Sequence, residues 1–357
     1  MKKQGRAKKI AAITLCVLVL FPIVTMPVAT VIIYESIFGF RYETPDWQEF
    51  SVEEFSGLQM QRSDFYAENG ERLAGYFYTS REQAEYKGIL VFAHGMGGGG
   101  QNGYMPIFHY FASNGYCVFA YDARGNDNSE GTSVEGLPRG VIDLNSAIDH
   151  VQSLEQYRHL PMVLMGHSWG AYSVGSVLSL HPEVKAAVLM AGFNESENQL
   201  YHQSSRFLGP VVDILIPPVY WYEQIKFGAE FTDLNAVDGM AATDAQIMIV
   251  HSVDDTTVPT EYGYDLFHAA YGENDRFTFV LFEDRGHGYL FCSEEALAYQ
   301  DSMAETYEKF VAEHGGRDTQ ELELEFMIRH LDKGRYFALD MELMADILSM
   351  YDLACAS

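Results

Sequence analysis

The sequence predicts an α/β protein built on a mostly parallel sheet of eight strands, with helices on both faces. Short apolar runs rich in β-branched and aromatic residues recur along the chain, and segments with helical spacing, such as 141–154 and 172–180, separate most of them. Continuous apolar strands that alternate with helices are typical of a parallel sheet buried on both faces. The first two strands flank Asn69-Gly70, a dipeptide that favours a tight hairpin turn. The expected strands are residues 58–67, 73–79, 88–93, 116–121, 162–165, 186–190, 246–250 and 277–282.

Two segments depart from this alternation. Residues 192–245, after the sixth strand, are too long for a simple connection, and long insertions in compact domains are often functional. We expect this insertion to form a lid over a substrate pocket, within a domain that spans residues 58–315. Residues 316–357 have helical apolar spacing and are expected to pack on the domain as an extension without chemistry. The candidate substrate or lid residues are the aromatic cluster Tyr220, Trp221 and Tyr222, for which a packed lid core is favoured over a dedicated acyl pocket, although the two are compatible.

Composition and charge exclude one class of partner. Of the 357 residues, 48% are hydrophobic and 14% aromatic, which is enough to bury a substantial core. The formal net charge is -27, and five of the 23 basic residues precede the first apolar run. The rest of the chain therefore holds 18 basic against 50 acidic residues. Such a surface repels phosphate backbones, so we expect no nucleic-acid partner. The oligomeric state is not indicated.

The four cysteines do not suggest a metal site or a disulfide framework. Cys16, Cys117, Cys292 and Cys355 lie far apart, with no C-x-x-C and no cluster of cysteine and histidine. We expect free or buried thiols, and a single disulfide between Cys292 and Cys355 is the alternative.

The amino terminus has the pattern of a membrane anchor. Residues 1–9 carry five basic residues and no acidic one, and residues 10–34 carry no charge. This run exceeds the ~20 apolar residues that a helix needs to cross a bilayer, and its basic flank is expected in the cytoplasm. The sequence predicts a transmembrane helix over 10–34, a linker over 35–57 and a folded domain outside the cytoplasm. A cleaved signal peptide is the alternative.

The strongest candidate for chemistry follows the fifth expected strand. Residues 166–170 read Gly-His-Ser-Trp-Gly, which is G-x-S-x-G between a strand and a helix, the context that this motif requires. The glycines allow a sharp turn that lifts the serine hydroxyl above the sheet edge. Ser168 is the candidate nucleophile, although a serine alcohol needs an adjacent base at neutral pH. His167 is expected to be structural.

Position selects a base among the twelve histidines. His287 lies between two glycines just beyond the last expected strand, and an open α/β sheet places its site in loops at the carboxyl ends of strands. An acid must then hold the imidazole in one tautomer. Asp254 and Asp255 follow the preceding strand, and their spacing does not separate them; Glu195 is a further candidate.

A glycine-rich loop follows the third expected strand. Residues 94–100 read His-Gly-Met-Gly-Gly-Gly-Gly. A tetrahedral oxyanion needs preorganised N–H donors, each worth about 2.7–4 kcal/mol of barrier, and Met96 and Trp169 are the expected backbone donors. His94, Gly95 and Gly97 would support the loop. A phosphate-binding loop is the alternative, but the run lacks the glycine and lysine spacings of such loops.

Together these motifs resemble the α/β-hydrolase superfamily, specifically bacterial serine hydrolases of the lysophospholipase-like and serine-aminopeptidase-like branches. The resemblance covers residues 58–314 and rests on the glycine loop, Tyr-Asp-Ala-Arg-Gly at 121–125, G-x-S-x-G, His-Ser-Val-Asp-Asp-Thr-Thr-Val-Pro at 251–259 and Arg-Gly-His-Gly at 285–288. In this family the acid is the aspartate four residues after the histidine of the fourth motif, which implies Asp255. The resemblance implies a Ser168, Asp255 and His287 triad that acts without metal or organic cofactor.

Two positions depart from the family pattern. Ser252 stands where a glycine usually follows the histidine, and residues 122–129 read Asp-Ala-Arg-Gly-Asn-Asp-Asn-Ser instead of D-x-R-G-x-G-x-S. Neither change removes a catalytic group, and the second alters a loop near the expected site.

The expected function is hydrolysis of a carboxylic ester or related acyl bond through an acyl-serine intermediate. The substrate would be a small molecule or a lipid-like acyl compound, met by a domain held at the outer face of the cell membrane. A serine exopeptidase with the same triad is the alternative and would need carboxylates near the pocket, for which Glu195, Glu197 and Glu223 are candidates. A non-catalytic surface binding protein is a third hypothesis, and four motifs in the right order argue against it.

Overall fold

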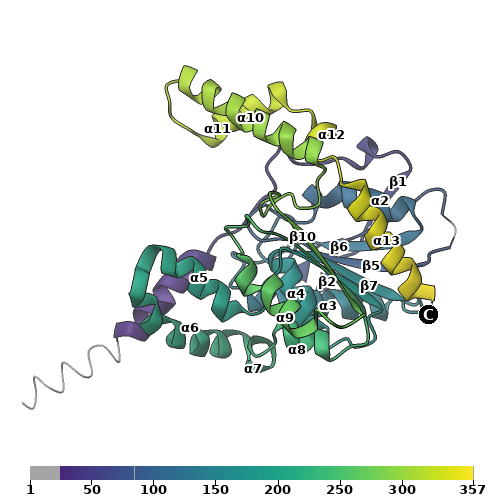
Figure 1. The fold of residues 1–357 in the computed structure, drawn as a ribbon, viewed down its shortest axis with the longest axis horizontal. Coiled ribbons are helices and arrows are strands. Elements are labelled where there is room, and N and C mark those ends of the chain that lie inside the picture. The colour runs from purple at the N-terminus through teal and green to yellow at the C-terminus, as the bar shows by residue number, and fades with distance from the viewer. Residues whose placement is uncertain (1–24, 84, 357) are drawn as a thin grey trace, which may run out of the picture.

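A computed structural model describes residues 25–83 and 85–356 of the chain. The predicted α/β architecture is confirmed, with a central sheet of eight strands in the order β1-β4-β6-β5-β7-β8-β9-β10 (Figure 1). All neighbours pair in parallel except β1 with β4 and β4 with β6. The eight strands are β1 (Leu58–Arg62), β4 (Gly75–Ser80), β5 (Gly88–Ala93), β6 (Tyr116–Tyr121), β7 (Met162–His167), β8 (Ala186–Met190), β9 (Gln246–Ser252) and β10 (Phe277–Phe282).

The predicted hairpin around Asn69-Gly70 is present but interrupted. β1 pairs with β4, and a separate two-stranded ribbon of β2 (Phe65–Tyr66) and β3 (Arg72–Leu73) forms the tip. Gly70 turns the chain with a φ of 82°, a conformation that favours glycine. The first strand is therefore shorter than the sequence predicts.

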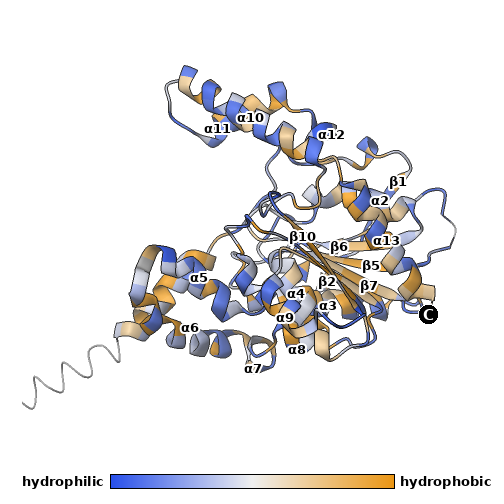
Figure 2. Cartoon of the chain, in the orientation of Figure 1, coloured by the Kyte–Doolittle hydropathy of each residue, from blue (hydrophilic) through white to orange (hydrophobic). Residues whose placement is uncertain are grey.

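Side chains alternate along the strands between two apolar layers. In β5, Ile89 and Val91 face one layer, whereas Leu90 and Phe92 face the other, and all four are fully buried. Figure 2 shows the resulting band of hydrophobic strands at the centre of the molecule. The first layer is completed by α3 (Pro138–Ser153), α4 (Trp169–Val177), α8 (Ala236–Ala241) and α9 (Tyr264–Tyr271), and the second by α2 (Met105–Ser113) and α13 (Met341–Ala356). Helices thus cover both faces, as predicted.

The long segment between β8 and β9 is a helical insertion. It contains α5 (Ser196–Leu208), α6 (Val212–Phe227), the short α7 (Ala229–Thr232) and α8. α5 and α6 extend away from the sheet, and the helical residues 25–38 lie beside them (Figure 1). Lys226 on α6 pairs with Glu35 at 2.5 Å, and Tyr34 donates a hydrogen bond to Glu223 at 2.7 Å.

The predicted membrane anchor over residues 10–34 needs correction. Within 25–83 and 85–356, no helix is both long enough and apolar enough to cross a bilayer. Residues 1–24, which include the basic segment and most of the uncharged run, lie outside the described residues. The described end of that run instead packs on α6 through Tyr34, whose ring is buried. The prediction of a single-pass anchor over residues 10–34, on which the predicted location rested, is therefore wrong.

The carboxyl-terminal part divides into an arm and a sheet-covering helix. α10 (Glu294–Glu313), α11 (Gln320–His330) and α12 (Lys333–Tyr336) form the arm that stands apart from the sheet in Figure 1. α13 returns to the sheet, where Tyr351 donates to the backbone oxygen of Leu164 at 2.7 Å. Cys117, Cys292 and Cys355 are free thiols, so no bridge joins the last two.

Candidate active site

Ser168 sits at the sharp turn between β7 and α4. Its φ of 55° and ψ of -115° are unusual for a residue with a side chain. The glycines at 166 and 170 permit the close packing of this turn. A Cβ on Gly166 would lie 2.3 Å from the oxygen of Gly170, and one on Gly170 would lie 2.0 Å from the oxygen of Ala93. The spacing of G-x-S-x-G thus follows from backbone contacts on both sides of the serine.

The structure brings Ser168, His287 and Asp255 together at the carboxyl edge of the sheet. Nε2 of His287 lies 2.8 Å from Oγ of Ser168, and its Nδ1 lies 2.7 Å from Oδ2 of Asp255. Because a carboxylate only accepts, Nδ1–H donates to Asp255, which leaves Nε2 free to accept the serine proton. The three residues follow β7, β10 and β9, whose parallel directions place their ends at one edge.

The carboxylate of Asp255 is fully buried and well bonded. Burial alone would raise its pKa, but the hydrogen bond and charge of His287 outweigh this effect, so the pKa lies below its ordinary value. Its Oδ1 also accepts from the backbone N–H groups of Thr257 and Val258, at 2.9 and 2.8 Å. Asp255 therefore stays ionised at neutral pH and holds the imidazole in one orientation.

The other acid candidates have different partners. Asp254 accepts from the hydroxyl of Ser252 at 2.5 Å and from the N–H of Gly286 at 2.8 Å. Ser252, which replaces the usual glycine, also accepts from the N–H of Arg285 at 2.9 Å. Asp254 and Ser252 thus fasten the loop that carries His287. Glu195 lies at the start of α5, where Asn198 donates to its carboxylate.

The glycine-rich loop lies beside Ser168. Met96 lines the same cavity as Ser168, and Trp169 is the first residue of α4, where backbone N–H groups lack helical partners. His94 is buried and supports the loop, because its Nδ1 donates to the oxygen of Gly95 at 2.7 Å and its Nε2 accepts from Ala123 at 2.9 Å. Gly97 adopts a φ of 99° within the loop.

The second departure from the family pattern also supports this loop. Asp127, at a position where the pattern has glycine, accepts from the N–H of Gly100 at 2.9 Å. It also accepts from both the N–H and the hydroxyl of Thr44, each at 2.6 Å. Asp127 thereby joins the glycine-rich loop to the segment that precedes the sheet.

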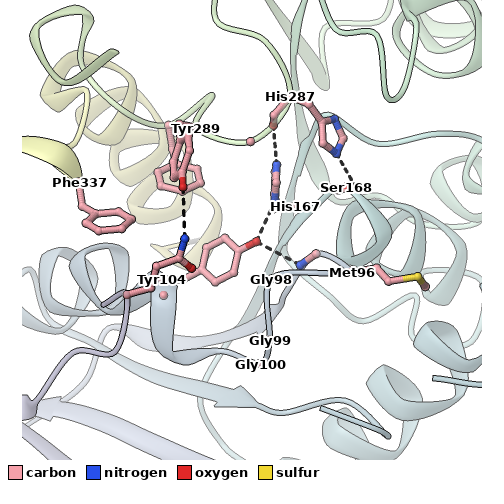
Figure 3. Close-up of a pocket in the computed structure, with 15 residues that line it drawn as sticks. Met96, Gly98, Gly99, Gly100, Tyr104, His167, Ser168, His287, Tyr289 and Phe337 are labelled. Carbon is pink, nitrogen blue, oxygen red and sulfur yellow. Dashed lines mark hydrogen bonds between the residues drawn. The ribbon is translucent and has the colours of Figure 1, made fainter. Parts of the chain in front are cut away.

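His167 makes contacts that the sequence did not predict. The N–H of Gly95 donates to the hydroxyl of Tyr104 at 3.2 Å, and this hydroxyl lies 2.9 Å from Nδ1 of His167. Nε2 of His167 then donates to the backbone oxygen of His287 at 2.8 Å (Figure 3). Burial, followed by the neighbouring His287, lowers the pKa of His167 to about 3, so its ring is neutral. The chain of bonds connects the glycine-rich loop to the loop of His287.

Ser168 opens into a cavity of about 210 Å³. Figure 3 shows aromatic side chains along the side of the cavity away from Met96. Tyr289 and Phe291 lie two and four residues after His287, and these two aromatic residues beside the predicted base are the signal by which the sequence could have indicated them. Gln48 and Phe337 also line the cavity, and they come from the expected linker and from the extension that was expected to lack chemistry.

The predicted aromatic contacts of the insertion do not line this cavity. Tyr222 donates to Glu35 at 2.6 Å, Tyr220 donates to Asp233 at 3.0 Å, and the Trp221 side chain is 62% exposed. The cluster therefore serves contacts within the insertion and with residues 25–38.

Comparisons with known proteins agree with the fold and the motifs. Residues 84–249 match the family model described as "Serine aminopeptidase, S33". The uncharacterized protein YfhR of Escherichia coli K12 is 22% identical over 249 residues, which cover 68% of this chain and 78% of that protein. A caffeoylshikimate esterase of Arabidopsis thaliana is 28% identical over 129 residues, which cover 35% of this chain and 38% of that enzyme.

Solved structures show the same fold. An esterase of Pyrococcus furiosus superposes with a TM-score of 0.51 at 14% identity, over 77% of this chain and 99% of that one. Residues 84–249 are thus similar to a serine hydrolase family, and the chain shares the fold of this esterase.

Proposed function

We propose that the chain is a serine hydrolase that cleaves small, uncharged carboxylic esters through an acyl-serine intermediate. The observation that carries the proposal is the pair of contacts made by His287, 2.8 Å to Ser168 and 2.7 Å to Asp255, at a strained turn that presents the serine to a cavity. Nucleophile, base and orienting acid in this relation are what acyl transfer to serine requires.

The reaction proceeds in two halves. His287 takes the proton of Ser168 as its oxygen attacks the ester carbonyl, and the backbone N–H groups of Met96 and Trp169 receive the oxyanion. His287 then returns the proton to the leaving alcohol, which leaves an acyl-serine. In the second half, His287 takes a proton from the water that attacks the acyl-serine, and it returns this proton to Oγ of Ser168 as the carboxylic acid departs. Asp255 stabilises the imidazolium in both halves.

The cavity supports a small and neutral substrate. Among the described residues that line it, none is aspartate, glutamate, lysine or arginine. A volume of about 210 Å³ lies below the ~300–1,000 Å³ typical of pockets for drug-sized ligands. A charged headgroup would find no counter-charge along this lining. A role of the helical insertion as a lid stays a prediction.

A serine aminopeptidase is the second candidate, favoured by the family match over 84–249. This activity would need a carboxylate that faces the substrate ammonium. Glu223 is buried and already accepts from Tyr34 and from Ser196, and Glu195 accepts from Asn198. Neither lines the cavity, which favours the ester substrate.

The test is labelling of the full chain with a fluorophosphonate probe, together with turnover of p-nitrophenyl esters of increasing chain length and of amino-acid p-nitroanilides. We expect labelling, fastest turnover of the shortest esters, and loss of kcat on the order of 10⁶ in Ser168→Ala. Ser179→Ala is the matched control, since the Ser179 hydroxyl bonds the oxygen of Ser176 and this residue does not line the cavity. A folded protein that neither labels nor turns over any ester contradicts the proposal, and faster p-nitroanilide turnover favours the peptidase.

A further inference from the structure

One side of the cavity is an aromatic wall, made of Tyr104, Tyr289, Phe291 and Phe337. The rings of Tyr104 and Phe291 have centroids 5.7 Å apart, and those of Tyr289 and Phe337 are 6.0 Å apart. Polar groups at the wall are few. The amide nitrogen of Gln48 lies 3.5 Å from the hydroxyl of Tyr289. Figure 3 shows the Tyr289, Tyr104 and Phe337 rings on the same side of the cavity.

The wall is assembled from segments on both sides of the hydrolase core in sequence. Phe337 lies between α12 and α13, and the rings of Trp47 and Phe50 pack against it with centroids 6.5 and 5.2 Å away. The segment of Phe50 is tied to the core through Asn102, which accepts from its N–H at 2.6 Å and donates to its oxygen at 3.0 Å. Phe337 is only 5% exposed, so its ring is held in place.

The wall is also fastened to the loop of the catalytic histidine. Arg285 pairs with Asp340 at 2.7 Å, and the N–H of Asp340 donates to the oxygen of Phe291 at 2.9 Å. Arg285 is two residues before His287, so Phe337 and His287 are fixed relative to each other. A substrate group against the wall is therefore held at a defined distance from Ser168.

We propose that the aromatic wall binds a planar aromatic group of the ester substrate and that Phe337 is the residue that determines this specificity. This inference rests on the proposed ester hydrolase function. Fixed rings favour a flat partner because offset and edge-to-face ring contacts are attractive, and a pocket whose rings are already ordered loses little entropy on binding. Either the acyl half or the alcohol half of the ester carries the aromatic group.

Two substrate pairs distinguish these halves: benzyl acetate against ethyl acetate, and methyl benzoate against methyl acetate. In each pair the measured quantity is the ratio of kcat/KM, so any general loss of activity cancels. In Phe337→Ala we expect one ratio to fall about tenfold or more, since a methylene or more of lost pocket complementarity changes kcat/KM by roughly 10–200-fold. The ratio that falls identifies the half that lies on the wall.

Two further variants separate specificity from folding. Phe337→Leu keeps an apolar side chain without a ring. We expect this variant to fold and to show the same fall in the kcat/KM ratio as Phe337→Ala. Phe326→Ala removes a buried phenylalanine from the same carboxyl-terminal part, but away from the cavity, and should leave both ratios within about twofold. Unchanged ratios in Phe337→Ala and Phe337→Leu, with acetate turnover retained, overturn the inference.

If the wild-type chain neither labels with the fluorophosphonate probe nor hydrolyses any ester, the ester hydrolase proposal fails and the wall is tested by binding alone. Trp47 packs on Phe337, so its fluorescence reports occupancy of the wall. Saturable quenching by benzyl alcohol that weakens at least fivefold in Phe337→Leu supports an aromatic site. Quenching that is equal in the wild type and in Phe337→Leu, or absent from both, overturns the inference of an aromatic site.

Discussion

Nε2 of His167 donates a hydrogen bond to the backbone oxygen of His287 at 2.8 Å, so the residue before Ser168 holds the loop of His287. The hydroxyl of Tyr104 forms a hydrogen bond with Nδ1 of His167 and accepts another from the N–H of Gly95. The glycine-rich loop, the turn at Ser168 and the loop of His287 are therefore linked through the side chains of Tyr104 and His167. Because the pKa of His167 is about 3, this linkage keeps one tautomer across the pH range in which the enzyme would work.

Replacement of His167 by phenylalanine keeps a buried ring and removes both hydrogen bonds. We expect kcat for the shortest p-nitrophenyl ester to fall about 10–100-fold, because small displacements of reacting groups cost that much. The KM should change far less. Tyr104→Phe removes one hydroxyl and should give a smaller loss in the same direction, with the acid limb of the pH–rate profile unmoved. A thermal unfolding midpoint that falls while kcat stays constant would assign these residues to stability alone.

The neighbouring aspartates provide a matched pair for the acid. Asp255→Asn should lower kcat by about 10⁴-fold, since an amide opposite Nδ1 favours the wrong tautomer of His287. Asp254→Asn makes the same carboxylate-to-amide change at the adjacent residue and leaves the contact between His287 and Asp255 in place. We expect a loss of about tenfold or less, through a looser Gly286 loop. Steady-state kinetics of the two variants decide between the acids, and equal losses would contradict the assignment.

The sequence predicted those parts of the molecule that local pattern determines. Ser168, Asp255 and His287 each follow an apolar strand of one parallel sheet, so the strand pattern alone places them at a common edge. The sequence pattern did not distinguish Asp254 from Asp255, because two adjacent residues have nearly the same spacing from the strand and from the other motifs. It follows from the turn after β9, in which the N–H groups of Thr257 and Val258 orient Asp255.

The remaining parts depend on packing between distant segments. No motif near Phe337 in the sequence indicates that its side chain reaches the cavity. Its segment is held there by the ion pair between Asp340 and Arg285, which are distant in sequence. The partners of the aromatic cluster on α6 also come from distant segments, since Tyr222 bonds Glu35 and Tyr220 bonds Asp233. The uncharged run likewise suggested a membrane, whereas Tyr34 at its end is buried against α6.

The backbone of Ser168 offers a test of the strained turn. A residue with a Cβ at φ 55° and ψ -115° costs on the order of 1–3 kcal/mol, and glycine largely avoids this cost. Both Ser168→Gly and Ser168→Ala lose the nucleophile, so stability is compared without activity. We expect Ser168→Gly to be more stable than Ser168→Ala by about 1 kcal/mol in urea unfolding, after allowance for the greater unfolded-state entropy of glycine. Equal stability would mean that the turn relaxes in solution.

Glu223 should make the stability of the chain fall with pH. Burial raises the pKa of this carboxyl from 4.5 to about 7, and this effect outweighs the hydrogen bonds from Tyr34 and Ser196, which lower the pKa. Between these two values the folded chain binds the proton that the unfolded chain has released. The free energy of unfolding therefore falls as pH rises from about 4.5 to 7, and the loss is complete above pH 7. Asp122 and Asp143, with pKa values raised by burial to about 7 and about 6, contribute in the same direction.

Glu223→Gln removes one of these three contributions and keeps an oxygen that accepts from Tyr34. We expect the decline in unfolding free energy between pH 5 and pH 8 to shrink by at most about 3 kcal/mol, the value of a shift of this size. Urea unfolding at several pH values measures it, with the exposed Glu230→Gln as the control for loss of a charge in the same insertion. An identical decline in Glu223→Gln and in the wild type would show that the Glu223 carboxyl reaches water, and that the contact of residues 25–38 with α6 opens as pH rises.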